Sequence, residues 1–249
     1  MGALLALLYD VHGNLPALEA VLREVDADVI LSGGDLVLGP MPSECLERLR
    51  ERGATFIRGN TDRHVVSPRA EEPGMWRTRA QWDHDRLTEE QLAFLASFPH
   101  PLSRDVDGLG SVLFCHGSPR SDEEIITAIT PPKRLDPMLD GVREQVIICG
   151  HTHVQFDRIV GDRRLVNAGS VGMPYEGKAG IACWALLGPD VELRRSNYDV
   201  ESAAEVIRAS GYPDAEEFVQ EYILAPASAE QATAHFEGVA EGDAGKPRG

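Results

Sequence analysis

The sequence predicts an α/β fold in which two β-sheets pack face to face with helices on the outside. In the first half of the chain, short apolar runs alternate with segments of helical spacing, and this βαβαβ order predicts a parallel sheet with right-handed crossovers. The stretch from Gln155 to Arg195 holds strand-like runs separated by turn residues and by no helix. Such a run favours an antiparallel second sheet, and stacking the two sheets is the simplest combination.

The first elements follow from apolar spacing and capping residues. Leu4–Tyr9 is a continuous apolar run, as in a strand buried on both faces. Asn14 can cap a helix over Leu15–Val25, whose apolar residues recur at helical spacing; a bond to a metal ligand is the alternative role of Asn14. The next expected elements are a strand at Asp28–Leu31, a helix at Pro42–Arg52 and a strand at Ala54–Arg58.

Residues 64–100 interrupt this alternation with a charge-rich segment. Thr88 and Gln91 form a capping box, which predicts a helix to about Ser97, and Pro99 and Pro101 end it. We interpret this segment as a cap-like insertion beside the functional edge of the sheet.

Strands resume after the insertion and two helices close the domain. The expected strands are Ser111–Cys115, Gln145–Cys149, Gln155–Val160, Arg164–Val166, Gly180–Leu187 and Val191–Arg195. Helical pieces are expected at Glu123–Thr130, at Leu135–Gly141 and, as two helices, within 200–224. Residues 1–225 therefore form one domain, and the small, polar residues of 226–249 predict a flexible tail.

The composition indicates which partners and which compartment suit the chain. With 24 basic and 40 acidic residues, the chain has a formal charge of −16, which repels nucleic-acid polymers and anionic membranes. No apolar run approaches the length of a membrane span. Cys115, Cys149 and Cys183 lie inside apolar runs without a disulfide pattern, and buried free thiols fit a cytoplasmic protein. A homodimer is the default oligomer for such a chain.

Seven side chains with oxygen or nitrogen donors follow strand-like runs, each within three residues of a glycine. They are Asp10, His12, Asp35, Asn60, His116, His151 and His153. Each alone is more often a turn residue, a cap or a surface histidine. Loops at the carboxyl ends of parallel strands converge on one crevice, so the seven are expected to meet there. They are too many for one tetrahedral ion and suit two divalent ions (Mn, Fe, Co, Ni or Zn) that share Asp35.

These motifs resemble the calcineurin-like metallophosphoesterase family. The matching segments are Asp10–Asn14, Gly34–Asp35 through Gly39–Pro40, Gly59–Asn60, His116–Gly117 and Gly150–His153, within a similarity that runs from about Leu4 to Leu187. Asn167–Gly172 is similar to the small bacterial and archaeal phosphodiesterase branch. The resemblance implies a four-layer β-sandwich of two mixed sheets flanked by helices.

The resemblance also implies a ligand set and a mechanism. One ion would be held by Asp10, His12, Asp35 and His153, and the other by Asp35, Asn60, His116 and His151. A hydroxide bridging the ions would attack phosphorus in line.

The chain departs from the family directly after Asn60. Many relatives have a histidine there that protonates the leaving group, whereas this chain has Thr61 followed by Asp62. The departure predicts weaker cleavage of esters with poor leaving groups, although the small phosphodiesterase branch often lacks the same histidine. His64 and His84 are candidate substitutes; solvated residues of the cap are the simpler interpretation.

Four more side chains near these motifs have two interpretations each. Arg58 and Arg63 flank Asn60 and could hold phosphate oxygens, or form surface ion pairs. Trp76 and Trp82 could form a base-stacking lid, or pack the cap onto the core.

The predicted function is a dinuclear metal-dependent phosphoesterase that hydrolyses phosphodiester or phosphoanhydride bonds of small substrates, nucleotides among them. A phosphomonoesterase or protein phosphatase is the alternative within the enzymes. A non-catalytic, metal-stabilised scaffold is the alternative outside them. All seven ligand positions are filled, which favours an enzyme.

Overall fold

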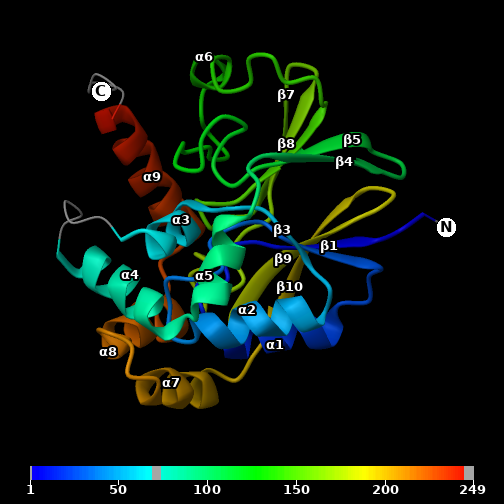
Figure 1. Ribbon diagram of the computed structural model, residues 1–249. Coiled ribbons are helices and arrows are strands. Elements are labelled where there is room, and N and C mark those ends of the chain that lie inside the picture. The colour runs from blue at the N-terminus through cyan, green and yellow to red at the C-terminus, as the bar shows by residue number, and fades with distance from the viewer. Residues whose placement is uncertain (1, 69–73, 244–249) are drawn as a thin grey trace.

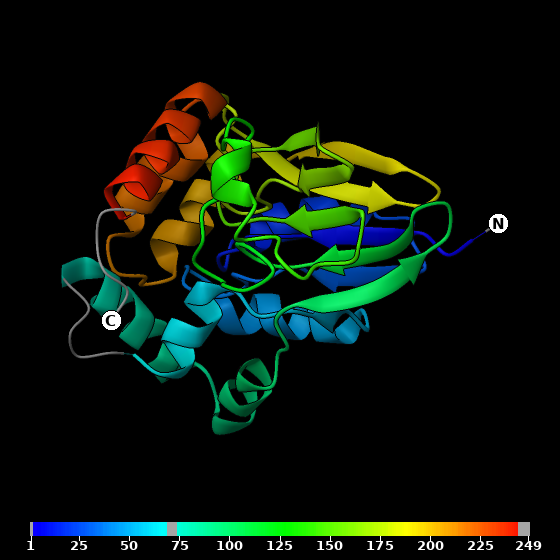
Figure 2. The ribbon, with the colours of Figure 1, turned by 90° about the horizontal axis from the view of Figure 1, so that it is seen from above.

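The computed structural model, which describes residues 2–68 and 74–243, has two mixed β-sheets stacked face to face between layers of helices (Figures 1 and 2). The strand orders are β10-β9-β1-β2-β3 in the first sheet and β4-β5-β6-β8-β7 in the second. The predicted fold class, a sandwich of two mixed sheets flanked by helices, is confirmed.

The first sheet contains the parallel strands that the sequence predicts. They are β1 (Leu5–Leu8), β2 (Val29–Ser32) and β3 (Thr55–Phe56), connected by α1 (Leu15–Glu24) and α2 (Pro42–Glu51). Asn14 caps α1 as expected, since its side-chain oxygen accepts a hydrogen bond from the Ala17 amide at 3.2 Å. The antiparallel strands β9 (Ile181–Leu187) and β10 (Val191–Asn197) complete this sheet beside β1.

The second sheet has a parallel centre and antiparallel edges. Its strands are β4 (Leu102–Val106), β5 (Gly110–Phe114), β6 (Val146–Cys149), β8 (Arg163–Asn167) and β7 (Phe156–Val160). Strands β5, β6 and β8 are parallel, and β4 and β7 pair with them antiparallel. Strand β4 was not predicted, since its polar residues are exposed at the sheet edge and form no apolar run.

The expectation that residues 155–195 form an antiparallel second sheet is wrong. The run is divided: β7 and β8 lie in the second sheet, and β9 and β10 lie in the first. The physical reason is burial on both faces of β9. Trp184 packs against the helices outside the sheet, whereas Ala185 faces the space between the sheets, so β9 needs a central position.

The apolar core lies between the sheets and beneath the outer helices. Tyr9, Leu31, Phe114 and Ile148 belong to the cluster between the two sheets and are fully or almost fully buried. A second cluster joins the first sheet to α1 and α2. Because the strands are packed from both sides, the points at which the loops leave their carboxyl ends are fixed as well.

The insertion is part of the helical layer. It comprises the end of α3 (Asn60–Val66), α4 (Gly74–Arg86) and α5 (Glu89–Ala96), and residues 69–73 of the expected cap lie outside the described residues. The predicted capping box of Thr88 and Gln91 is present at the start of α5. Trp82 meets the edge of Tyr212 with ring centroids 5.2 Å apart, so the packing role expected for Trp82 is confirmed.

The helix expected at Glu123–Thr130 is absent, and this prediction is wrong. Those residues form an irregular loop, in which the Thr130 hydroxyl accepts a hydrogen bond from the Thr127 amide at 2.8 Å. Such side-chain bonds compete with helical backbone bonds. The helix expected at Leu135–Gly141 is displaced: α6 spans Pro132–Leu135, and turns follow to Gly141.

The C-terminal part is more regular than the sequence predicted. The two expected closing helices are α7 (Val200–Ala209) and α8 (Ala215–Phe218), the latter continued by the π-helix η1 (Val219–Leu224). The flexible tail expected over 226–249 is wrong for α9 (Ala229–Asp243), and 244–249 lie outside the described residues. Ser228 and Gln231 cap α9 through reciprocal hydrogen bonds of 2.9 and 3.2 Å.

Within the described residues, none of the helices combines the length and the apolar character that crossing a membrane requires.

The packing between the sheets predicts the effect of a core truncation. Leu7 has 0% of its surface exposed, so Leu7→Ala is expected to lower the free energy of unfolding by about 3 kcal/mol. Ile159 on β7 is 68% exposed, and Ile159→Ala serves as the control, with an expected change below about 0.5 kcal/mol. Equilibrium unfolding in urea measures both variants. Equal losses in the two would contradict this description of the core.

Candidate metal centre

All seven predicted donor residues lie together at the carboxyl ends of the strands. Two groups of three have their donor atoms within 4.8 Å of one another: Asp10, His12 and His153, and Asp35, His116 and His151. The seventh residue, Asn60, adjoins the second group, with its side-chain oxygen 3.2 Å from His116 Nε2. The two groups correspond to the two ligand sets that the family resemblance implied.

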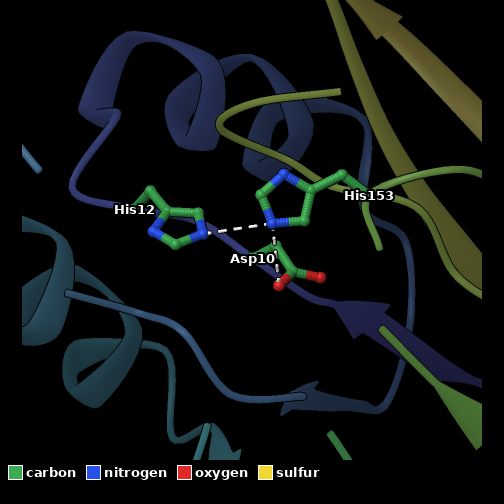
Figure 3. Close-up of side chains that lie close together, drawn as sticks. All are labelled: Asp10, His12 and His153. Carbon is green, nitrogen blue, oxygen red and sulfur yellow. Dashed lines mark hydrogen bonds and ion pairs between the residues drawn. The ribbon is translucent and has the colours of Figure 1, made fainter. Parts of the chain in front are cut away.

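The first group joins the end of β1 to the loop after β6. Figure 3 shows Asp10, His12 and His153 pointing toward one another. His153 Nε2 lies 3.3 Å from Asp10 Oδ1 and 3.2 Å from His12 Nε2. Asp10 Oδ1 is buried and has no hydrogen-bond partner among the described residues. A buried carboxylate oxygen without a donor is costly, and a bound cation would satisfy it.

Asp35 connects the two groups. Its Oδ2 lies 3.3 Å from His116 Nε2 in the second group and 3.7 Å from His12 Nε2 in the first. Its other oxygen, Oδ1, accepts a hydrogen bond from the Thr61 amide at 2.8 Å. The carboxylate is therefore held with Oδ2 directed between the two groups, where a shared ligand would be needed.

The backbone is strained at most of the donors. Positive φ angles of 45° to 65° occur at five of the seven, namely Asp10, His12, Asp35, His151 and His153. Leu38 and Asp214 are the other non-glycine residues of the described chain with positive φ. A non-glycine residue in this conformation costs about 1–2 kcal/mol, and such strain is concentrated at functional sites. The arrangement is therefore maintained for its side-chain positions and at the expense of stability.

Backbone carbonyls orient two of the histidines. His116 Nδ1 lies 3.1 Å from the Gly33 carbonyl oxygen, and His153 Nδ1 lies 3.0 Å from that of Met173. Because a carbonyl can only accept, Nδ1 carries the hydrogen and donates it. In the neutral ring the lone pair is then on Nε2, which faces the centre, as in ligating histidines.

Asp62 ties the loops around Asp35 together. Its carboxylate accepts hydrogen bonds from the amides of Asp35, Leu36 and Gly59 at 2.9 Å each, and from Val37 at 3.3 Å. Gly59 is needed at this close approach, because a Cβ there would lie 2.1 Å from Asp35 Oδ1. This role of Asp62 was not predicted from the sequence. The available signal was an acidic residue at the third position of a helix that follows a glycine.

The insertion supports the same loops from the other side. Asp83 of α4 is buried and accepts hydrogen bonds from the amides of Leu38 and Gly39 at 2.7 and 3.2 Å. The Thr61 hydroxyl donates to the Val37 carbonyl at 3.1 Å. Directly after Asn60, this chain therefore has a residue whose hydroxyl holds the backbone at Val37.

His64 and His84, the candidate substitutes for the missing acid, were expected to be solvated residues of the cap, and this expectation is wrong. His64 is buried, 3.5 Å from Glu123 and edge-on to Trp76, and His84 is half-buried and donates from Nδ1 to the Val65 carbonyl at 2.8 Å. A further histidine that the sequence reasoning missed, His100, accepts a hydrogen bond from the His116 amide at 3.1 Å.

The two arginines beside Asn60 form ion pairs. Asp122 lies 3.2 Å from Arg58 Nε and accepts two hydrogen bonds of 3.1 Å from Arg63. Glu123 adds a 2.7 Å contact to Arg63. The ion-pair interpretation is confirmed, and the pairs hold both guanidinium groups near the centre.

The protonation states of two of the histidines suit a cation, whereas a third would have to release a proton to bind one. Burial lowers the pKa of His12 and of His151 to about 4, so both rings are neutral at pH 7. Burial acts in the same direction on His116, but the nearby Asp35 and Asp10 carboxylates raise the pKa of that ring to about 10. Carboxylates, an amide oxygen and imidazoles are together suitable ligands for first-row divalent metals.

The chain belongs to the calcineurin-like phosphoesterase superfamily, whose domain model matches residues 4–187. A metallophosphoesterase from Sphaerobacter thermophilus is 28% identical, with a TM-score of 0.70 over 88% of this chain and 98% of that one. A hypothetical protein from Pyrococcus horikoshii is 20% identical, with a TM-score of 0.79 over 90% and 99% of the two chains. An uncharacterized protein of Methanocaldococcus jannaschii is 28% identical over 235 residues, 85% of this chain and 95% of the relative.

The bonds of Asp62 predict that this residue supports metal binding. Asp62→Ala removes the acceptor of four amides and frees the loop that carries Asp35, so we expect about 10–100-fold weaker Mn²⁺ binding. Calorimetric titration of metal-stripped protein measures the affinity, and Asp105→Ala at an exposed position of β4 is the control. Unchanged affinity in Asp62→Ala would refute the supporting role.

The burial of His100 predicts a pH-dependent stability. Burial lowers the pKa of His100 from its ordinary 6.5 to about 4, so between these values the unfolded chain binds the proton more readily. The contribution of neutral His100 is present above pH 6.5 and is lost as the pH falls toward 4. We expect His100→Gln to lose less unfolding free energy than wild type between neutral pH and about pH 5. Urea titrations at both pH values test this, and parallel losses would contradict it.

Proposed function

We propose that this protein is a dinuclear metal-dependent phosphoesterase that hydrolyses phosphodiester or phosphoanhydride bonds of small molecules, nucleotides among them. The observation that carries the proposal is the Asp35 carboxylate, whose Oδ2 is 3.3 Å from a histidine of one group and 3.7 Å from a histidine of the other. A shared carboxylate between two sets of ligands is the arrangement that a two-metal hydrolase requires.

The donors divide between two ions. Asp10, His12, Asp35 and His153 would hold one, and Asp35, Asn60, His116 and His151 would hold the other. Mn²⁺, Fe²⁺, Co²⁺, Ni²⁺ and Zn²⁺ suit this mixture of ligands. When bound, such ions supply an activated water near neutral pH and neutralise phosphoryl oxygens.

The other residues of the centre position ligands and substrate. Asn60 contributes a neutral oxygen, which leaves the pair of ions with the positive charge that attracts a phosphoester. Arg58 and Arg63, held beside Asn60 by Asp122, are in a position to receive phosphoryl oxygens. Since Asp122 already pairs with both arginines, the substrate would share or displace this carboxylate.

The preference for diesters and anhydrides rests on Thr61. Its hydroxyl donates to a carbonyl and its amide to Asp35, so it offers no titratable group to a leaving oxygen. Esters whose leaving group needs no acid are then favoured. The net charge of −16 disfavours long polyanions as substrates and leaves small phosphoesters as the expected class.

Hydrolysis by reconstituted protein tests the proposal. Metal-stripped protein is reloaded separately with Mn²⁺, Ni²⁺, Co²⁺ or Zn²⁺ and assayed with bis(p-nitrophenyl) phosphate and p-nitrophenyl phosphate. We expect faster cleavage of the diester, and a loss of at least about 100-fold in kcat/KM for Asp35→Asn, which keeps the shape but not the charge of the shared ligand. Asp162→Asn, exposed in the β7–β8 turn, is the matched control.

Each other outcome indicates a different function. Faster cleavage of the monoester would favour the phosphomonoesterase. Binding of two ions without turnover on either substrate would favour the metal-stabilised scaffold.

A further inference from the structure

Two aromatic rings border the histidines of the candidate centre. The ring of Tyr175 stacks on His153, with centroids 5.5 Å apart and an angle of 19° between the planes. Phe236 of α9 lies 6.2 Å from Tyr175 and 6.4 Å from His151, between ring centroids. The two rings therefore form a continuous aromatic surface, here called the aromatic wall, against both histidines of the Gly150–His153 segment.

The aromatic wall is separate from the apolar core. Tyr175 and Phe236 are half-buried, and neither belongs to the hydrophobic clusters found among the described residues. Phe236 also lies beyond residues 4–187, which the superfamily domain comprises. An aromatic side chain that only anchored α9 would be expected to lie within one of these clusters.

Polar contacts already fix α9. Glu237 accepts hydrogen bonds from the hydroxyls of Thr127 and Thr130 at 2.5 and 2.7 Å, and from Arg134 at 2.6 Å. These bonds join α9 to α6 and to the loop before it, and place the neighbouring Phe236 beside His151. In Figures 1 and 2, α9 lies beside the functional edge of the sheets.

Tyr175 is held by the loop that orients a metal ligand. The Met173 carbonyl accepts the Nδ1 hydrogen of His153, and the Tyr175 amide donates to the His153 carbonyl at 3.5 Å. The ring of Tyr175 and the imidazole of His153 are thus positioned by the same short segment. A group that packs on the aromatic wall would be placed at a fixed distance from the centre.

We propose that the aromatic wall is a substrate subsite that binds a planar aromatic group attached to the phosphoester, an inference that rests on the proposed function. Nucleobases and aryl rings stack on aromatic side chains through their flat faces, whatever their pattern of hydrogen-bonding groups. Being uncharged, such a ring is not repelled by the acidic chain. The centre would recognise the phosphate, and Tyr175 and Phe236 would recognise the ring.

Matched ligands test the subsite by binding rather than by turnover. Mn²⁺-loaded protein is titrated calorimetrically with adenosine 5′-monophosphate and with ribose 5-phosphate, which share the sugar and the phosphate. We expect the nucleotide to bind roughly tenfold more tightly, as stacking of one base provides. Phe236→Ala and Phe236→Leu should bring the two affinities together, and Phe236→Tyr should keep them apart, because only the last retains a ring.

Further variants and one further ligand sharpen the test. Glu237→Gln weakens the attachment of α9 without changing the ring and should reduce the preference, whereas Val239→Ala on the same helix is the control. Phenyl phosphate separates the two kinds of ring: tighter binding than ribose 5-phosphate would show that the subsite accepts any aryl group, and weaker binding that it selects a nucleobase.

The inference and the proposed function fail differently. Equal binding of nucleotide and sugar phosphate by wild type, no binding of either, or an unchanged preference in Phe236→Ala would overturn the subsite, even where diester hydrolysis is intact. The protein could instead bind the nucleotide more tightly than the sugar phosphate and yet hydrolyse no phosphoester with any metal. That result would overturn the proposed function and leave the aromatic wall as a binding surface.

Discussion

The hydrogen bonds that Asp62 accepts from the turn around Asp35 are the interaction on which the centre depends. Asp35 has a φ of 52°, a conformation that a non-glycine residue does not keep without support. Asp62 accepts a hydrogen bond from the Asp35 amide and another from the amide of Gly59, the residue before Asn60. The two bonds connect the turn at Asp35 to the start of α3. The positions of the Asp35 carboxylate and of the Asn60 amide are therefore set by one buried side chain.

The residues of the centre could be predicted from the sequence because their signal is local. Asp10, Asp35 and His151 each follow an apolar strand and lie within three residues of a glycine, and the carboxyl ends of parallel strands lie at one edge of the sheet. The structure brings all seven donors to that edge, in the two groups that the family resemblance implied. The parallel half of the first sheet was predictable for the same reason, since each of its crossovers is short.

The missed features depend on contacts between distant parts of the chain. The position of β9 beside β1 joins residues about 180 apart, and no local period encodes such a pairing. His100 and Asp83 serve the centre from the insertion, through bonds to backbone amides that carry no side-chain signature. The capping pair of α9, Ser228 and Gln231, could be recognised in the sequence. The helix itself is held by Glu237 rather than by an apolar stripe, so its sequence has no hydrophobic periodicity that would predict it.

The arrangement separates the chemistry from the choice of substrate. The seven donors lie within residues 4–187, the part shared with the superfamily, where strain and buried charge restrict change. Phe236 lies outside that part, on a helix attached by a few polar contacts, and can vary without disturbing a strand end. Thr61 belongs to the first region and, under the proposed function, would limit which bonds can be cleaved, because it supplies no acid. Selectivity among the cleavable esters must then come from groups that contact the rest of the substrate, and the aromatic wall lies directly beside the ligands where that contact would occur.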